Sequence, residues 1–155
     1  MNFAAKTAVF LATGFYVGRI PLAPGTFGSL LGLPICFLMA GIEMPAAIVV
    51  VLLLIAVASW IAGAAARTLG QADPGCIVID EIAGIVITLM GLPFNPTTAV
   101  VGFILFRILD ILKPFPIRVL DKRLPGGLGI VADDVVAGIF SNAILRILLL
   151  ILDRY

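Results

Sequence analysis

Two matching pairs of adjacent carboxylates are the residues of this chain best suited to chemistry. Each pair follows an Ile-Val-x motif and precedes an apolar run with a glycine: Asp80 and Glu81 in one copy, Asp133 and Asp134 in the other. Carboxylates are costly beside hydrocarbon and usually have a function there. Hard oxygen ligands without histidine or cysteine suit Mg²⁺, which keeps several of its waters. The four acids therefore predict a shared Mg²⁺ site.

Adjacent acids at the start of a helix also have an ordinary explanation. They complement the positive end of the helix dipole and cap free backbone N–H groups. This explanation suffices for either pair alone. It is weaker for two matching pairs, each of which opens an apolar segment. The sequence therefore favours the metal site over capping.

A second candidate group combines basic and acidic side chains at the end of an apolar segment. Arg107, Asp110 and Lys113 recur every three residues and share one broad helix face, and Arg118 follows a Pro-Phe-Pro turn. An ion pair between Arg107 and Asp110 explains part of this pattern without any chemistry. Next to a metal site we favour a cationic cradle for phosphate, in which arginine binds two oxygens and lysine acts as a point charge.

The third candidate is a turn-rich segment near the N-terminus. Residues 18–29 contain two prolines and several glycines, which interrupt regular structure before a helix starts. Backbone N–H groups that lead into a helix bind phosphate readily, and Thr26 or Ser29 is suited to cap that helix. We therefore predict a substrate-binding loop formed by Pro24, Gly25, Thr26 and Ser29. Proline-glycine loops are common, so this signal is weak by itself.

The composition predicts an integral membrane protein. Of 155 residues, 62% are hydrophobic and 12% are charged, whereas a soluble domain is about half apolar and about a quarter charged. A chain this short cannot bury so much apolar surface in its own core. A net charge of +1 without a basic run argues against nucleic-acid binding. Cys36 and Cys76 lack metal-ligand or redox spacing, and histidine is absent, which disfavours zinc, haem and thiol chemistry.

The elements that position these residues are all expected to be helices. We predict an all-α fold, a compact polytopic membrane protein with about four spanning helices plus a short N-terminal apolar helix, in a single domain over residues 1–155. Glycine-rich residues 125–129 are expected to form a flexible turn. The expected apolar segments are Phe3–Tyr16, Phe27–Ala40, Ala46–Ala66, Ile77–Leu92, Thr97–Leu112 and Val131–Leu152.

The distribution of basic residues predicts the orientation in the membrane. If the charged loop 113–129 is cytoplasmic, alternating helices place loops 67–75 and residue 19 on the same side. Loops 41–45 and 92–96 are then outside, and neither contains lysine or arginine. Both acid pairs and the Arg107 group lie toward the cytoplasmic ends of their helices in this arrangement, so the candidate groups are expected to converge. Lys122 and Arg123 are expected at the anionic headgroup surface.

Four motifs in this order resemble the phosphatidylglycerophosphatase A family of bacterial membrane phosphatases. They are Pro24-Gly-Thr-x-Gly-Ser29, Ile79-Asp-Glu-x-x-Gly84, Phe106-Arg-x-x-Asp-x-x-Lys-Pro-x-Pro-Ile-Arg118 and Gly126-Gly-x-Gly-Ile-x-x-Asp-Asp-x-x-Ala-Gly138. The resemblance implies Mg²⁺-dependent hydrolysis of the terminal phosphomonoester of phosphatidylglycerophosphate. It further implies an inner-membrane enzyme of phosphatidylglycerol synthesis whose active site faces the cytoplasm.

In this interpretation one or two metal ions polarise the phosphoryl group and activate water. Arg107, Lys113 and Arg118 neutralise the phosphate oxygens, and Asp110 either orients Arg107 or completes the metal shell. Direct attack by water is preferred over an aspartyl-phosphate, because the Asp-x-Asp-x-Thr/Val signature is absent. The number of metal ions and the oligomeric state stay open.

Two other function classes share some of these features. A CDP-alcohol phosphotransferase also uses acids and metal in a membrane, but its Asp-Gly-x-x-Ala-Arg motif is absent from this chain. A small ion transporter explains buried acids without catalysis, but its acids are expected near the middle of the bilayer. Metal-dependent release of phosphate distinguishes an enzyme from a transporter.

Overall fold

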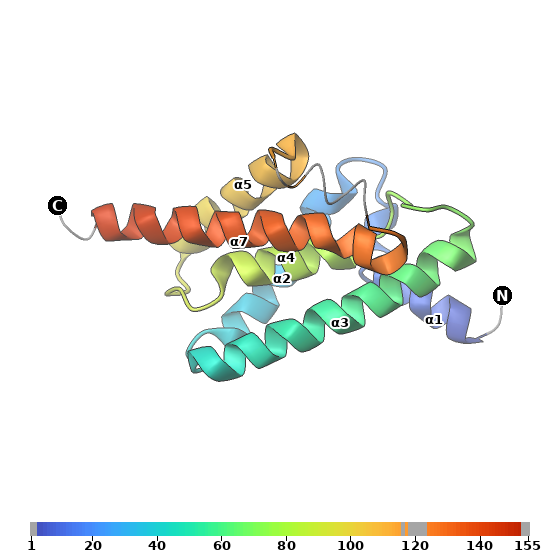
Figure 1. The fold of residues 1–155 in the computed structure, drawn as a ribbon, viewed down its shortest axis with the longest axis horizontal. Coiled ribbons are helices and arrows are strands. Elements are labelled where there is room, and N and C mark those ends of the chain that lie inside the picture. The colour runs from blue at the N-terminus through green and yellow to red at the C-terminus, as the bar shows by residue number, and fades with distance from the viewer. Residues whose placement is uncertain (1–2, 116, 118–123, 153–155) are drawn as a thin grey trace.

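The computed structural model describes residues 3–115, 117 and 124–152, and every regular element in these ranges is helical (Figure 1). The expectation of an all-α fold is confirmed for this part of the chain. Helix α1 is the short N-terminal apolar helix that the sequence predicts. In chain order the elements are α1 (Phe3–Ala12), the 3-10 turn η1 (Val17–Arg19), α2 (Pro24–Met39), α3 (Met44–Leu69), α4 (Ile79–Leu89), α5 (Pro96–Leu112) and α7 (Gly126–Leu152).

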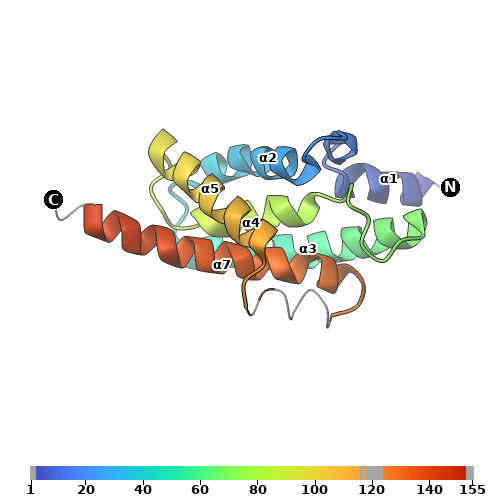
Figure 2. The ribbon, with the colours of Figure 1, turned by 90° about the horizontal axis from the view of Figure 1, so that it is seen from above.

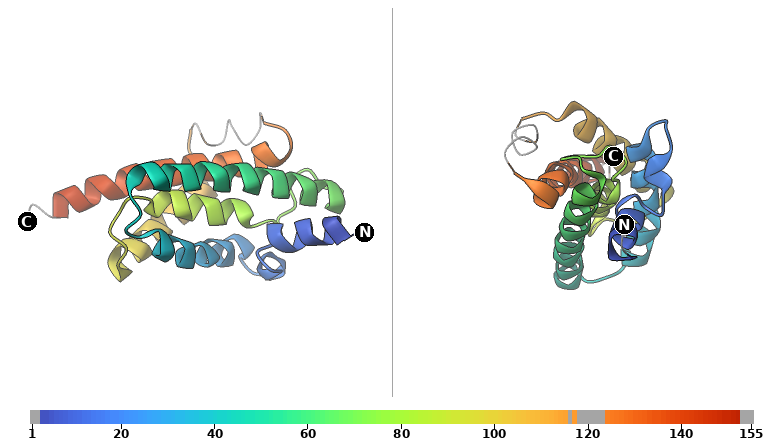
Figure 3. Two further views of the ribbon diagram at one scale, coloured as in Figure 1. Left: turned by 90° about the horizontal axis from the view of Figure 1, so that it is seen from below. Right: turned by 90° about the vertical axis from the view of Figure 1, so that its right-hand side faces the viewer.

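Helix α4 lies in the centre of the bundle. Nine of its eleven residues are buried, and the two that keep some exposure are Asp80 and Glu81. A helix that is apolar on all sides is stable when neighbours cover every side. Helices α2, α3, α5 and α7 all pack against α4, and the end-on view in Figure 3 shows it in the middle. The first acid pair is thus attached to the most enclosed helix of the protein.

From α2 onward, successive helices run in alternating directions, as the sequence-based topology requires. Helices α2, α4 and α7 begin toward the end of the bundle at which α3 and α5 finish (Figure 1, Figure 2). We call this the acidic end, because the acids of α4 and α7 lie there. Short connections between antiparallel neighbours produce this arrangement. It brings residues far apart in the sequence to one end of the molecule.

Glycines let α4 and α7 approach closely beside the acids. A Cβ added at Gly138 would lie 2.6 Å from the carbonyl oxygen of Gly84. A Cβ at Gly84 would lie 3.1 Å from the carbonyl oxygen of Asp134 and would overlap the ring of Phe106. Small residues at such crossings allow the two backbones to touch. Gly84 and Gly138 therefore serve the close packing of α4 against α7.

Polar side chains of α7 satisfy the backbone at the other end of α4. The amide nitrogen Nδ2 of Asn142 donates hydrogen bonds to the carbonyl oxygens of Ile87 (3.1 Å), Thr88 (2.9 Å) and Met90 (3.0 Å). Arg146 donates from Nη2 to Met90 O at 2.9 Å and from Nε to Asn142 Oδ1 at 2.8 Å. The last carbonyls of a helix have no intrahelical donors. Arg146 and Asn142 of α7 thus supply donors to the carbonyls that follow α4.

Two helices of the described chain are long and apolar enough to cross a membrane, α3 with 26 residues and α7 with 27. Most residues of their apolar stretches are not buried within the protein, and Leu52, Trp60 and Leu150 are among the exposed side chains. A span needs about 20 apolar residues, whereas α4 has 11 and α5 has 17. By length, two of the roughly four expected spans are therefore present in the described residues.

The start of α7 differs from the sequence prediction. The glycine-rich segment 125–129, expected to be a flexible turn, is helical from Gly126 onward. A Cβ at Gly127 would lie 2.7 Å from the backbone nitrogen of Gly63 and would overlap the carbonyl oxygen of Ser59. Glycine therefore lets the first turn of α7 lie directly on α3, and this packing offsets the low helix propensity of glycine.

This earlier start changes the setting of the second acid pair. Asp133 and Asp134 lie in the third turn of α7 and not at its opening. The first four N–H groups of a helix are the ones that need capping, so these acids have no capping role. The prediction that both pairs open their helices is correct for Asp80 and Glu81 only.

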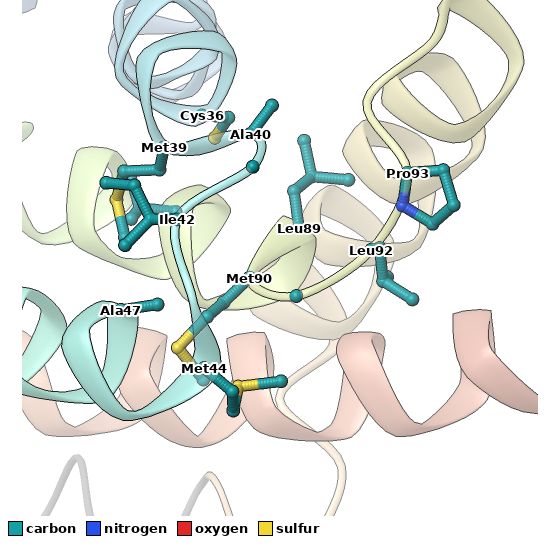
Figure 4. A pocket seen from close by; sticks show the side chains of 13 residues that line it. Cys36, Met39, Ala40, Ile42, Met44, Ala47, Leu89, Met90, Leu92 and Pro93 are labelled. Carbon is teal, nitrogen blue, oxygen red and sulfur yellow. The ribbon is translucent and has the colours of Figure 1, made fainter.

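An apolar cavity lies at the end of α4 opposite its acids (Figure 4). Its volume is about 400 Å³, and Figure 4 shows Cys36, Met39, Leu89 and Met90 among the side chains around it. The residues that line it include no carboxylate and no basic side chain. The cavity is therefore separate from the residues to which the sequence assigns chemistry.

Candidate active site at the acidic end

Three of the four predicted metal ligands converge on one point. Asp80 and Glu81 in the first turn of α4 and Asp134 in the third turn of α7 each offer a carboxylate oxygen, and these oxygens lie within 4.8 Å of one another. The close crossing of α4 and α7 at Gly84 positions them, because the carbonyl of Asp134 faces that glycine. The crossing of α4 and α7 thus brings three acids close to one another.

These three acids have buried oxygens with no hydrogen-bond partner among the residues that the structure describes. The atoms are Oδ1 of Asp80, Oε2 of Glu81 and Oδ2 of Asp134, and Asp134 as a whole is 3% exposed. Burying an unpaired carboxylate oxygen is costly. Three acids whose carboxylate oxygens lie this close together have the donor set that a hard divalent cation uses. They form a candidate cation site at the position that the sequence indicates.

The fourth predicted ligand, Asp133, has a cationic partner. Its Oδ2 lies 2.5 Å from Nζ of Lys113, and the residue is 5% exposed. Asp133 also belongs to a second acidic group, in which one oxygen each of Asp110, Asp133 and Asp134 lie within 4.8 Å. Asp134 is common to both groups, so the two pairs form one continuous site.

Arg107 connects α5 to the first acid pair. Its Nη1 donates a hydrogen bond of 2.7 Å to Oδ2 of Asp110 and lies 3.9 Å from Oε1 of Glu81. The Arg107–Asp110 ion pair, one of the two interpretations of the sequence pattern, is present. Because Arg107 also reaches Glu81, the pair does more than stabilise α5. It holds a guanidinium group beside Glu81, one of the three converging acids.

The first turn of α2 closes the site from another side. A Cβ added at Gly25 would overlap Oε1 of Glu81 and would lie 2.9 Å from Nη1 and 3.0 Å from Nη2 of Arg107. Only a residue without a side chain leaves both groups in place. The N–H of Gly25 belongs to the first helical turn, where N–H groups have no intrahelical acceptor. The backbone of α2 therefore touches the site, as the sequence predicts for Gly25.

The other residues of the predicted loop have different roles. The segment is not an open loop, because α2 already begins at Pro24. The residue before it, Ala23, has a left-handed backbone conformation with φ 50°. Proline fits the first helical position because the missing N–H has no partner there. Ser29 is completely buried and donates a 2.8 Å hydrogen bond to Gly25 O, so its hydroxyl is engaged within α2. Thr26 is half-buried beside Arg107.

Three basic residues of the sequence analysis cannot be placed. Arg118, assigned to the phosphate cradle, and Lys122 and Arg123, assigned to the headgroup surface, lie outside the described residues. Of the predicted cationic cradle, the structure thus locates Arg107 and Lys113. Both come from the last two turns of α5 or the residue after it.

A row of glycines on α2 was not singled out from the sequence. A Cβ at Gly28 would lie 2.6 Å from Cβ of Val78, and one at Gly32 would overlap Ile85. Together with Gly25 they recur at three- and four-residue intervals along one face. That spacing is a signal for close helix packing. It lets α2 lie against the start of α4 and so brings Gly25 to the site.

The arrangement combines two chemical capacities at one end of the bundle. Three buried carboxylates are suited to bind a divalent cation. Arg107, Lys113 and the start of α2 surround them with positive charge and an N–H donor, which are the groups that bind phosphate. Such a pairing is typical of sites that act on phosphate esters.

Comparison with known proteins agrees with this chemistry. The family model described as "Phosphatidylglycerophosphatase A" matches residues 10–149. Phosphatidylglycerophosphatase A of Escherichia coli (strain K12) is 45% identical over 136 residues, which are 87% of this chain and 79% of that protein. Phosphatidylglycerophosphatase A of Haemophilus influenzae is 38% identical over 133 residues, 84% of this chain and 82% of that protein.

A relative with a different name matches over a greater length. A Bacteroides thetaiotaomicron protein named "Putative phosphatidylinositol-3-phosphatase" is 35% identical over 149 residues, which are 90% of this chain and 91% of that protein. No solved structure matches this one. The matched residues 10–149 include every acid of the site, as well as Arg107 and Lys113. The chain belongs to the phosphatidylglycerophosphatase A family.

Proposed function

We propose that this protein is a lipid phosphatase that hydrolyses the terminal phosphomonoester of phosphatidylglycerophosphate, giving phosphatidylglycerol and phosphate. The observation that carries the proposal is the set of three converging acids with unpartnered buried oxygens, placed directly beside Arg107. Family membership supports the same substrate, because two relatives of high coverage carry that activity in their names. The whole described chain is proposed to act as one domain.

We propose Mg²⁺ as the cofactor, held by Asp80, Glu81 and Asp134. The donor set fits, because all three are hard oxygen ligands and each has a buried oxygen without a partner in the described part of the chain. Bound there, Mg²⁺ would supply positive charge for the phosphoryl oxygens and would acidify a water molecule. Asp133, the fourth predicted ligand, is assigned mainly to Lys113, with which it pairs.

The remaining side chains bind and orient the phosphate. Asp110 holds Arg107 through an ion pair of 2.7 Å. The guanidinium group is thereby fixed beside the acids, where it can bind two phosphate oxygens. Lys113 is steadied by Asp133 and adds a second positive charge. The N–H of Gly25 provides a neutral donor from α2. These groups neutralise the charge on the phosphate oxygens as the bond to the leaving oxygen breaks.

We further propose a multi-pass arrangement in the bacterial inner membrane with the acidic end facing the cytoplasm. The alternating helix directions agree with the distribution of basic residues between loops (Figure 1). Helices α3 and α7 are long enough to span. Helices α2, α4 and α5 are shorter and complete the bundle within the same layer, with α4 enclosed by its neighbours.

Phosphate release in detergent tests the proposal. The purified protein is incubated with phosphatidylglycerophosphate in the presence of Mg²⁺ or of a chelator, alongside a phosphatidylinositol 3-phosphate arm suggested by the third relative. We expect Mg²⁺-dependent release from phosphatidylglycerophosphate, faster than from the inositol lipid. A faster rate on the inositol lipid would replace the proposed substrate. Absence of release from either lipid by a folded protein would favour the ion transporter.

A further inference from the structure

An apolar groove runs along α5 beside the site. Its volume is about 360 Å³, and it lies against the start of α2. The residues that line it are Thr26, Phe103, Ile104, Arg107, Ile108, Ile111 and Leu112. From Phe103 to Leu112 the groove follows α5 for about 13 Å at about 1.5 Å per residue. Arg107 is its one charged lining residue, and the rest of its wall is almost entirely apolar.

The groove is continuous with the site through the residues that they share. Arg107 lines the groove and also reaches Glu81 and Asp110. Thr26 lines it from α2, one residue after Gly25, whose backbone touches the same guanidinium group. A molecule in the groove therefore has a phosphate-binding group at its side and hydrocarbon surface along the rest of its length.

The groove opens sideways, toward the layer that the apolar helices occupy. The side chains of Ile104 and Ile108 on its wall are 49% and 46% exposed, and those of Ile111 and Leu112 are more exposed still. Helices α2 and α5, which border it, make few contacts with each other. The acyl chain of a lipid can therefore enter between the two helices from the bilayer without crossing the aqueous face.

We infer that this groove binds the glycerol and acyl part of the substrate, so that the lipid reaches the acids laterally between α2 and α5. The inference rests on the proposed function, since it needs a lipid phosphomonoester at the acids. Burial of acyl methylenes against Phe103, Ile104 and Ile108 then contributes to substrate binding. The groove recognises the acyl chain, whereas Arg107 and the acids recognise the phosphate.

Filling the groove tests this separation. Ile104→Trp and Ile108→Trp each place a larger ring in the groove at partly exposed positions, where folding tolerates the change. The readout is kcat/KM for phosphatidylglycerophosphate divided by kcat/KM for its deacylated, water-soluble form. We expect this ratio to fall roughly tenfold in each variant, which corresponds to the loss of about two buried methylene groups. The fall should arise mainly in KM for the lipid.

Ile147→Trp is the matched control, because Ile147 is equally apolar, 58% exposed and on α7, outside the groove. It should keep the wild-type ratio. If Ile104→Trp and Ile108→Trp also keep that ratio while the wild type hydrolyses both substrates, the groove is not the acyl site and the proposed function stands. If the wild type hydrolyses neither substrate, the proposed function fails and the acyl assignment fails with it.

Discussion

Gly25→Ala is the change that most sharply probes the geometry of the site. The added methyl group would overlap Oε1 of Glu81 and approach Nη1 of Arg107 at 2.9 Å. Ordinary carbon contacts begin at about 3.5 Å. Either α2 or both side chains must therefore move by several tenths of an ångström to about one ångström. Because Glu81 and Arg107 already touch other groups of the site, their room to move is small.

A displacement of this size should reduce catalysis as well as stability. Misplacing a phosphate-binding group by about 1 Å costs on the order of 100-fold in rate, which is about 2.7 kcal/mol of transition-state stabilisation. The overpacking itself costs about 1–3 kcal/mol of folding free energy. We therefore expect kcat/KM for phosphatidylglycerophosphate to fall about 100-fold in a variant that still folds.

Gly75→Ala provides the matched control for this experiment. Gly75 lies between α3 and α4, and a Cβ there meets nothing within 4 Å. The assay is phosphate release in detergent with Mg²⁺, accompanied by a thermal unfolding curve for each variant. Wild-type kcat/KM in Gly25→Ala would refute the close contact of α2 with Glu81 and Arg107. Equal losses in both glycine variants would show a general effect on folding.

Three further predictions follow from other contacts. Asn142→Ala removes three hydrogen bonds to the end of α4 and should lower the unfolding free energy by about 2–4 kcal/mol; an unchanged Tm would contradict this capping role. Lys113→Met removes the ammonium group that pairs with Asp133 and should reduce kcat/KM at least about tenfold. Lys113→Arg should retain part of the activity. Full activity of the methionine variant would exclude Lys113 from phosphate binding. Gly84→Ala pushes against the ring of Phe106 between α4 and α7 and should cost about 1–3 kcal/mol of stability, which a chemical unfolding series checks against Gly75→Ala.

Much of the candidate site could be predicted from the sequence because its residues are exceptions to an apolar background. Asp80, Glu81 and Asp134 stand out in a chain with few charges, and topology alone places them at one end. The structure brings these three together as expected. Arg107 was also located correctly, because spacing by threes along α5 puts it on the face that carries Asp110.

The parts that could not be predicted depend on packing between helices. The start of α7 at Gly126 contradicts local propensity, because glycine favours a turn until a neighbouring helix such as α3 accepts its bare backbone. The engagement of Ser29 within α2 is likewise a consequence of burial against neighbours. Pairing of Asp133 with Lys113 joins residues 20 positions apart, and no sequence pattern specifies which of the acids pairs with the lysine.

Binding of a divalent cation is the most direct test of the central claim, since it does not depend on the substrate. Mn²⁺, a paramagnetic substitute for Mg²⁺, is titrated into the purified protein and followed by electron paramagnetic resonance, for the wild type, Asp134→Asn and Glu43→Gln. Glu43 lies at the other end of the bundle, just before α3, and serves as the control. We expect a Mn²⁺ site for which Mg²⁺ competes, and we expect it to be lost in Asp134→Asn and retained in Glu43→Gln. Wild-type Mn²⁺ binding in a folded Asp134→Asn protein would contradict this expectation.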